Sequence, residues 1–175
     1  VWITYNGEIY NFKQIRARLE SKGHKFLSNT DTEVILNSYK EKGIQCVEEF
    51  NGIFAFCIYD IKQRCIFLVR DRLGIKPLYY YYNNDKFIFS SEIKAFKVCD
   101  ELKLEKDETS ILEYYQSSNI TGESFLKGIE ILKPGHYLRV DLANNTLSIE
   151  KYVDVYGDIS KTKYTAFNNA KEEDV

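Results

Sequence analysis

Two neighbouring apolar segments constrain the fold of this chain more than any other feature. Residues 53–59 read Ile-Phe-Ala-Phe-Cys-Ile-Tyr and residues 65–69 read Cys-Ile-Phe-Leu-Val, with a polar turn between them. A strand with one solvated face alternates apolar and polar residues, whereas these two lack alternation and should be buried on both faces. The pattern therefore predicts an α+β fold of four layers, ordered helix, sheet, sheet, helix, with antiparallel strands.

The segments before these strands have helical spacing. Asn11 and Gln14 form a pair that resembles a capping box, and Thr30 and Glu33 form a better one. Each helix then ends at a glycine. The predicted elements are a helix over 11–23, a short strand over 25–28, a helix over 30–43 and a helical turn over 45–50.

The later segments alternate between strand and helix signals. Asn83, Asn84 and Asp85 form a good hairpin turn between two aromatic runs. From Tyr156 onward the composition is polar, which is typical of a linker. The predicted elements are strands over 78–82 and 87–90, helices over 91–96 and 107–115, and strands over 136–140 and 146–149.

Composition excludes several classes of function. The 175 residues are 44% hydrophobic with a net charge of −2, which fits one globular domain and offers no electrostatic footprint for nucleic acid. No apolar run is long enough to cross a membrane. The four cysteines include no Cys-x-x-Cys pair, and His24 and His136 are isolated, so no metal site is expected. Free thiols and the lack of a signal peptide favour the cytoplasm.

Asn6 and Gly7 follow an apolar stretch and are the best candidates for a functional site. A side-chain amide next to a glycine N–H can aim two donors at one point, as an oxyanion hole requires. The alternative is a hairpin turn, for which Asn-Gly is also a strong signal. A hairpin needs a second strand at once, but a helical pattern follows Asn11 instead.

Five motifs resemble the glutaminase domain of asparagine synthetase, a class II glutamine amidotransferase of the N-terminal-nucleophile hydrolase type. They are YNGEIYN at 5–11, NTDTEVI at 29–35, FNGIFAF at 50–56, RDRLGIKPLY at 70–79 and SSEIKA at 90–95. Their order holds across residues 1–153. The resemblance implies an αββα sandwich over residues 1–155, with 156–175 linking to a C-terminal synthetase domain.

The resemblance also implies roles for four residues. The side-chain amide of Asn6 and the N–H of Gly7 would form the oxyanion hole, and both would contact the substrate glutamine. Glu8 and Asp31 would bind the glutamine ammonium group, which needs carboxylate or carbonyl partners if it is buried. For Asp31 the alternative is helix capping and complementation of the helix dipole, and for Glu8 it is a solvated turn.

The departures from the family pattern concern the catalytic group and the chain ends. The family nucleophile is an N-terminal cysteine, whereas Val1 stands first here, so we expect that upstream sequence, including the first strands of the fold, is missing. The chain as given should then be inactive. ATP and Mg²⁺ would bind in the synthetase domain, and this part of the chain needs no cofactor. A homodimer is compatible with the resemblance.

The expected parent protein is a glutamine-hydrolysing asparagine synthetase, a ligase of amino-acid biosynthesis. Ammonia released through a cysteinyl thioester would amidate aspartate at the expense of ATP. Two alternatives stay open: a non-catalytic module that keeps the amidotransferase fold, and an amidotransferase that serves another acceptor. The run from Arg70 to Lys76 has three cations beside Gly74, but it lacks the loop and helix of a phosphate site. We interpret it as a turn between core strands whose charges pair with each other or with a neighbouring domain.

Overall fold

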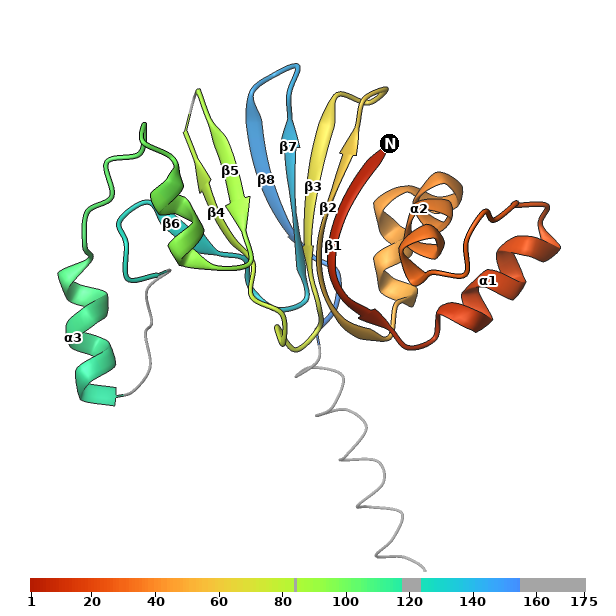
Figure 1. Ribbon diagram of the computed structural model, residues 1–175, viewed down its shortest axis with the longest axis horizontal. Helices are drawn as coiled ribbons and strands as arrows, with labels where there is room; N and C mark the ends of the chain where they lie inside the picture. The colour runs from red at the N-terminus through yellow and green to blue at the C-terminus, as the bar shows by residue number, and fades with distance from the viewer. Residues whose placement is uncertain (84, 118–123, 155–175) are drawn as a thin grey trace, which may run out of the picture.

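Two antiparallel sheets form the centre of the protein. The computed structural model describes residues 1–83, 85–117 and 124–154, which excludes the predicted linker over 156–175. One sheet has five strands in the order β1-β2-β3-β7-β8, and the other has three in the order β5-β4-β6 (Figure 1). The strands are β1 (Trp2–Ile9), β2 (Gly52–Asp60), β3 (Cys65–Arg70), β4 (Tyr79–Tyr82), β5 (Phe87–Ser90), β6 (Ile129–Ile131), β7 (His136–Asp141) and β8 (Thr146–Lys151).

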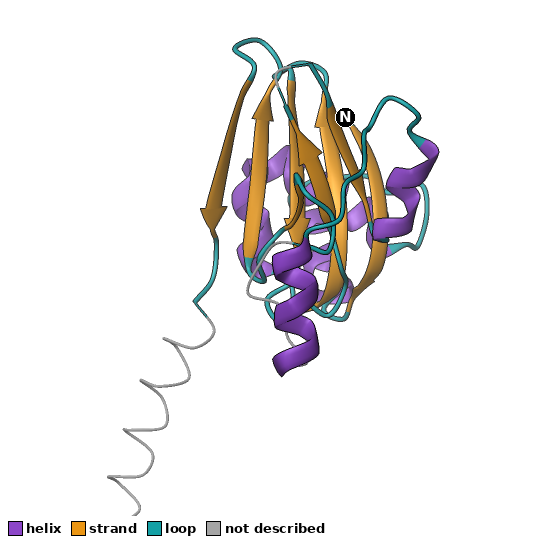
Figure 2. Ribbon diagram, turned by 90° about the vertical axis from the view of Figure 1, so that its left-hand side faces the viewer, coloured by secondary structure: helices purple, strands orange, loops and turns teal. Residues whose placement is uncertain are grey.

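Helices lie on the outer sides of the two sheets. The helices α1 (Phe12–Ser21) and α2 (Asp31–Lys42) and the 3₁₀ helix Gly43–Glu49 cover the five-stranded sheet. The helix α3 (Glu108–Ser117) lies beyond the three-stranded sheet, on the side away from α1 and α2, and a second 3₁₀ helix spans Ile93–Val98 (Figures 1 and 2). The layers therefore follow the predicted order of helix, sheet, sheet, helix.

Two separate cores explain why β2 shows no alternation. Phe54, Phe56 and Ile58 pack in the core beneath α1 and α2. Ala55 and Cys57, which alternate with them, pack in the core between the two sheets. Each face of β2 is thus buried against a different layer, as the apolar run predicts. The fold class is confirmed.

The helix starts differ in part from the capping pattern of the sequence. Thr30 caps α2, because its hydroxyl accepts the Glu33 N–H at 3.4 Å. Asn11 makes no side-chain cap for α1. Its amide instead donates to the Glu49 carbonyl at 2.9 Å and its oxygen accepts the Asn51 N–H at 3.0 Å. Asn11 therefore ties the start of α1 to the chain that enters β2.

The strand predicted over residues 25–28 does not form. The Glu33 carboxylate accepts the N–H groups of Leu27 and Ser28, at 2.8 and 2.7 Å, and it also accepts the Ser28 hydroxyl. A side chain from the first turn of α2 thus takes the place of a neighbouring strand as the partner of this backbone. The short strand β6 has no counterpart in the prediction.

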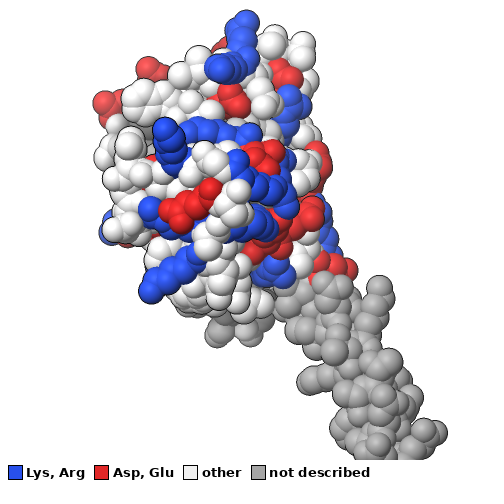
Figure 3. All heavy atoms as spheres, turned by 90° about the vertical axis from the view of Figure 1, so that its right-hand side faces the viewer, with Lys and Arg blue, Asp and Glu red and all other residues white. Residues whose placement is uncertain are grey.

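The outer face of the helical layer carries charges of both signs, interspersed (Figure 3). Several are paired across neighbouring segments. Lys22 and His24 both contact Glu41, at 2.6 and 2.7 Å, and Arg16 pairs with Glu20 at 2.8 Å within α1. The paired lysine and histidine lower the pKa of Glu41 to about 2. These ion pairs keep the outer face of the helical layer polar, and exposed pairs of this kind contribute little to stability.

Candidate functional site

Asn6 and Gly7 lie inside β1, which continues as far as Ile9. The sequence pattern places them at the end of a strand, directly after its apolar residues, and in the structure the strand continues two residues beyond Gly7. In the antiparallel register Asn6 faces Ala55 and Gly7 faces Phe54, both on β2. The hairpin alternative is excluded, because β1 pairs with a strand more than 40 residues away and its end leads directly into α1.

Gly7 is required by the close approach of two strands. Its φ is +150°, and a Cβ at this position would lie 2.1 Å from the carbonyl oxygen of Ile53. Gly52 on β2 is in the reciprocal situation, since its Cβ would lie 2.1 Å from the Glu8 carbonyl oxygen. The two glycines let β1 and β2 approach each other beside Asn6.

The N–H of Gly7 faces the open edge of the sheet. Residues of an antiparallel pair alternate between those bonded to the partner strand and those directed away from it. Tyr10 N–H bonds the Asn51 carbonyl, whereas Ile9 N–H bonds Asp31 instead. Gly7 lies two residues before Ile9, so its N–H points to the same side of the strand. Its partner Phe54 accepts the Asp71 N–H with its carbonyl, on the side away from β1. Within the described residues β1 is the edge strand, so this donor points outward.

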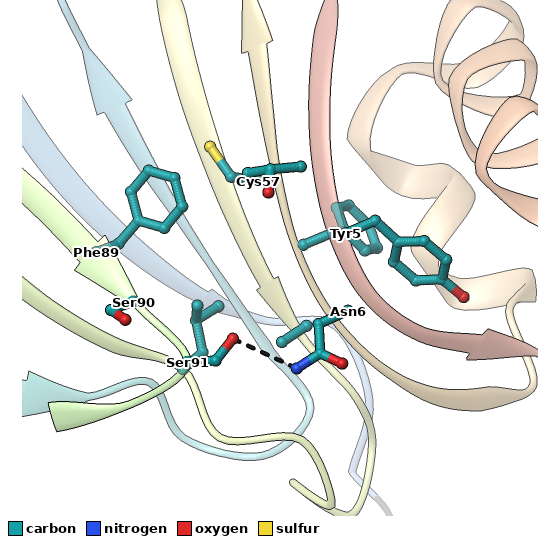
Figure 4. A pocket seen from close by; sticks show the side chains of 10 residues that line it. Tyr5, Asn6, Cys57, Phe89, Ser90 and Ser91 are labelled. Carbon is teal, nitrogen blue, oxygen red and sulfur yellow. Dashed lines mark hydrogen bonds between the residues drawn. The ribbon is translucent and has the colours of Figure 1, made fainter. Parts of the chain in front are cut away.

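The side chain of Asn6 lies in a pocket between the two sheets. Strands β1, β2 and β5, together with Leu78 just before β4 and Ser91 just after β5, line this pocket of about 240 Å³. The Asn6 amide donates to the Ser91 hydroxyl at 3.4 Å, a long and weak hydrogen bond (Figure 4). An amide nitrogen carries two hydrogens, so one remains for a ligand. The lining residues are Thr4, Tyr5, Asn6, Ala55, Phe56, Cys57, Leu78, Phe89, Ser90 and Ser91.

Cys57 is the cysteine that lines this pocket. It pairs with Thr4 across the β1–β2 ladder. The pair of Asn6 and Ala55 lies two residues along the ladder and on the same face of the sheet. Burial raises the pKa of its thiol to about 12. Because the thiolate is the nucleophilic form, Cys57 is a structural thiol at neutral pH. Cys46, Cys65 and Cys99 are also free, and the first two are buried.

Asp31 is fixed at the start of α2 by two hydrogen bonds from β1. Its Oδ2 atom accepts the Tyr5 hydroxyl at 2.6 Å and the Ile9 N–H at 3.0 Å. Thr30 is the residue whose side chain caps the helix, and Asp31 lies in the first turn, where its charge also complements the helix dipole. In the described part of the chain no hydrogen bond reaches Oδ1, which leaves this oxygen open beside the edge of β1.

Glu8 is exposed, and among residues 1–83, 85–117 and 124–154 its carboxylate has no hydrogen-bond partner. Its charge nevertheless acts on Tyr5. The pKa of the Tyr5 phenol is raised by burial first, then by its bond to Asp31, and also by the charges of Asp31 and Glu8. Two carboxylates thus lie near one phenol, which concentrates negative charge at this end of β1 and suits a cationic ligand group.

The structure therefore brings the four predicted site residues to one end of β1. Asn6, Gly7 and Glu8 are consecutive, and Asp31 joins them through Tyr5 and Ile9. Sequence reasoning missed Tyr5 and Ser91. Tyr5 could have been found, since a hydroxyl on the core-facing side of a strand needs a polar partner. Ser91 lies 85 residues from Asn6 and gives no local signal.

The run after β3 is a structural turn. Asp71 accepts four backbone N–H groups, and Arg70 donates to the carbonyls of Lys76, Leu132 and Gly74 at 2.7–2.8 Å. The two side chains thus bond to backbone rather than to each other, so the predicted pairing of these two charges with each other is wrong. Pairing of the other charges in the run with a neighbouring domain stays a prediction. The backbone donors to Asp71 are Phe54, Leu73, Ile75 and Lys76.

The described residues meet the requirements of neither a metal site nor a membrane-spanning helix. The described residues contain no group of three or more His, Cys, Asp or Glu side chains that could hold a metal ion. No helix among them has the length and apolar character of a membrane span.

Comparisons with known proteins identify the family and the fold. A family described as "Glutamine amidotransferase domain" matches residues 1–153. The chain belongs to this family. The amidotransferase domain is 40% identical to asparagine synthetase [glutamine-hydrolyzing] 3 of Bacillus subtilis over 155 residues, which cover 87% of this chain and 25% of the relative. It is 46% identical to putative asparagine synthetase [glutamine-hydrolyzing] 2 of Methanocaldococcus jannaschii over 114 residues, covering 65% and 22%.

Solved structures show the same fold. Glutamine phosphoribosylpyrophosphate amidotransferase from B. subtilis, complexed with ADP and GMP, matches 86% of this chain and 29% of its own, with a TM-score of 0.61 and 20% identity. The amidotransferase domain thus has the N-terminal-nucleophile type of sandwich, and its resemblance to the glutaminase domain of asparagine synthetases is confirmed. The chain spans about a quarter of the length of the curated relatives given above.

Proposed function

We propose that this domain releases ammonia from glutamine within a glutamine-hydrolysing asparagine synthetase. The observation that carries the proposal is the placement of two donors on β1: the Asn6 amide in the pocket and the adjacent Gly7 N–H, which is directed away from β2. Asp31 is anchored at Ile9, two residues or about 7 Å farther along the strand. An extended glutamine could place its side-chain amide at the donors and its ammonium at the carboxylates.

The reaction proceeds through a thioester in this proposal. A thiolate attacks the side-chain amide carbon of glutamine, and the resulting oxyanion is stabilised by Asn6 and Gly7. The C–N bond then breaks, ammonia leaves with the proton taken from the thiol, and water hydrolyses the thioester to glutamate. The Cys57 thiol, with its raised pKa, is unsuited to this attack, and the family resemblance assigns it to an N-terminal cysteine of the complete protein.

The ammonia would amidate aspartate in a second domain, where ATP and Mg²⁺ would bind. The relatives that carry "asparagine synthetase" in their names support this acceptor. The four free thiols suit a reducing compartment such as the cytoplasm.

Asn6→Ala in the complete protein tests the proposal. The loss of one oxyanion donor should lower kcat for glutamine hydrolysis about 10²–10³-fold, with a much smaller change in KM. Synthesis from added ammonia should survive, because it bypasses this site. Asn144→Ala, at an exposed turn between β7 and β8, is the control and should leave both activities unchanged.

Three results would contradict the proposal. Equal loss of glutamine-dependent and ammonia-dependent synthesis would show that Asn6 only supports the fold. Full glutaminase activity in Asn6→Ala would remove it from the oxyanion hole. A complete wild-type protein without glutamine hydrolysis would favour the non-catalytic alternative.

A further inference from the structure

Tyr5 and Asp31 form a contact between β1 and α2 that the proposed reaction does not yet use. The Tyr5 hydroxyl donates to Asp31 Oδ2 at 2.6 Å, in a contact between residues 26 positions apart. The same oxygen accepts the Ile9 N–H at 3.0 Å. Both hydrogen bonds therefore reach the same carboxylate oxygen, Oδ2, and they direct the Oδ1 atom away from the strand.

The ring of Tyr5 is held firmly on the side of the sheet that faces the helices. It packs against the core beneath α1 and α2, whereas the adjacent Asn6 points into the pocket on the other face (Figure 4). Successive residues of a strand face opposite sides. Neighbouring residues of β1 thus reach the two ends of the proposed substrate site from opposite faces of the sheet.

We propose that Tyr5 is a positioning residue, which fixes the Asp31 carboxylate so that its free oxygen meets the α-ammonium of glutamine. One backbone N–H leaves a carboxylate free to turn about its side-chain bonds, and the phenol supplies the second anchor. The phenol can donate throughout the neutral range, because burial and the neighbouring carboxylates raise its pKa. The inference rests on the proposed glutaminase function.

A second tyrosine in the same helical layer supplies a matched control. Tyr39 of α2 is buried, and its hydroxyl donates to Asp60 Oδ2 at 3.0 Å. Asp60 ends β2 and also accepts two N–H groups of the following turn. This contact joins the same helix to the same sheet by the same pair of residue types, but its aspartate belongs to a turn and not to the site.

The experiment compares Tyr5→Phe with Tyr39→Phe in the complete enzyme. Tyr5→Phe removes one hydrogen bond to a charged group and should raise KM for glutamine about 5- to 20-fold, with kcat changed less than threefold. Tyr39→Phe should leave KM for glutamine within twofold of wild type, although it should lower the melting temperature at least as much as Tyr5→Phe does. Ammonia-dependent synthesis should be retained in both variants.

Two further measurements separate positioning from a structural role. Glutaramate has the amide and carboxylate of glutamine but no ammonium, so Tyr5→Phe should not raise its KM. In an Asp31→Asn background, Tyr5→Phe should add less than a twofold increase in KM for glutamine, because the residues act on the same group.

The outcomes distinguish this inference from the function on which it rests. A wild-type enzyme that does not hydrolyse glutamine would overturn the proposed function. If it does hydrolyse glutamine, three results would each overturn the role of Tyr5 alone: an unchanged KM in Tyr5→Phe, an equal rise in KM in Tyr39→Phe, or an equal rise for glutaramate.

Discussion

Two polar clusters lie at the same end of the five-stranded sheet, and they differ in how far their hydrogen bonds are satisfied. In the turn cluster, Asp71 is 1% exposed with four backbone donors, and Arg70 is 8% exposed with three carbonyl acceptors. In the site cluster, formed by Asn6, Gly7, Glu8 and Asp31, the Asn6 side chain makes one long hydrogen bond and the Glu8 side chain makes none among the described residues. Saturated, buried groups hold a turn in place, whereas exposed groups with open capacity can bind a ligand.

The difference also separates two similar sequence patterns. Both clusters combine charged residues with a glycine, and the turn cluster has the greater density of charge. Burial lowers the pKa of the Arg70 guanidinium, which is the signature of a cation used inside the protein. Charge in the sequence is therefore a poor guide to binding here, and the remaining hydrogen-bonding capacity is a better one.

Asp71→Ala should have the largest effect, and it should fall on stability. The substitution leaves four backbone N–H groups without their acceptor, at a position where water has little access. We expect a loss of at least about 3 kcal/mol in the free energy of unfolding. Urea unfolding measures it, with Asp85→Ala in the exposed β4–β5 turn as control. A loss below about 1 kcal/mol would mean that the turn cluster is not structural.

Asp31→Asn should show the opposite division between binding and stability. Thr30 caps α2, and the amide oxygen of asparagine can still accept the bonds from Tyr5 and Ile9, so the melting temperature should change little. The lost charge should raise KM for glutamine about 10- to 100-fold, or about 1.4–2.8 kcal/mol.

The control for Asp31→Asn is Asp107→Asn, because Asp107 accepts backbone N–H groups at the start of α3. It should change neither KM nor the melting temperature, since asparagine caps about as well as aspartate. A large fall in melting temperature for Asp31→Asn without a rise in KM would place Asp31 among the structural residues, with Asp71.

The layers could be predicted from the sequence, because they depend on a property that a single strand displays. The loss of alternation over residues 53–59 reports burial on both faces, and no knowledge of the partner layers is needed. The strand predicted over residues 25–28 failed for the converse reason. Its apolar residues match a strand, but Glu33 satisfies its backbone, and no strand pattern contains that information.

The residue types of the site could be predicted from the sequence, but the contacts that depend on the fold could not. Asn6 and Gly7 were identified as donors from their types, but their place inside β1 follows from pairing with β2. The anchoring of Asp31 by Tyr5 joins residues 26 positions apart, and the contact of Asn6 with Ser91 joins residues 85 apart. Neither contact follows a helical or strand period, so the sequence cannot show which residues pair, although the Tyr5 hydroxyl alone signals that it needs a polar partner.

Ser91→Ala should have the smallest effect, and it sharpens the comparison within the site cluster. The Ser91 hydroxyl is the partner of the Asn6 amide, and removing it should loosen that donor without removing it. Because a bond of 3.4 Å is weak, we expect kcat for glutamine hydrolysis to fall about two- to fivefold, with KM and the melting temperature nearly unchanged.

If Ser91 acts through Asn6, the two substitutions should not be additive. Ser91→Ala should have no further effect on kcat in an Asn6→Ala background, because the donor that it orients is already absent. Ser21→Ala removes a hydroxyl that bonds a carbonyl on α1 and should have no effect in either background. An additive loss in the double variant would show that Ser91 contacts the substrate directly. The site cluster would then include a residue of the three-stranded layer, and the pocket between the two sheets would be the substrate site from both sides.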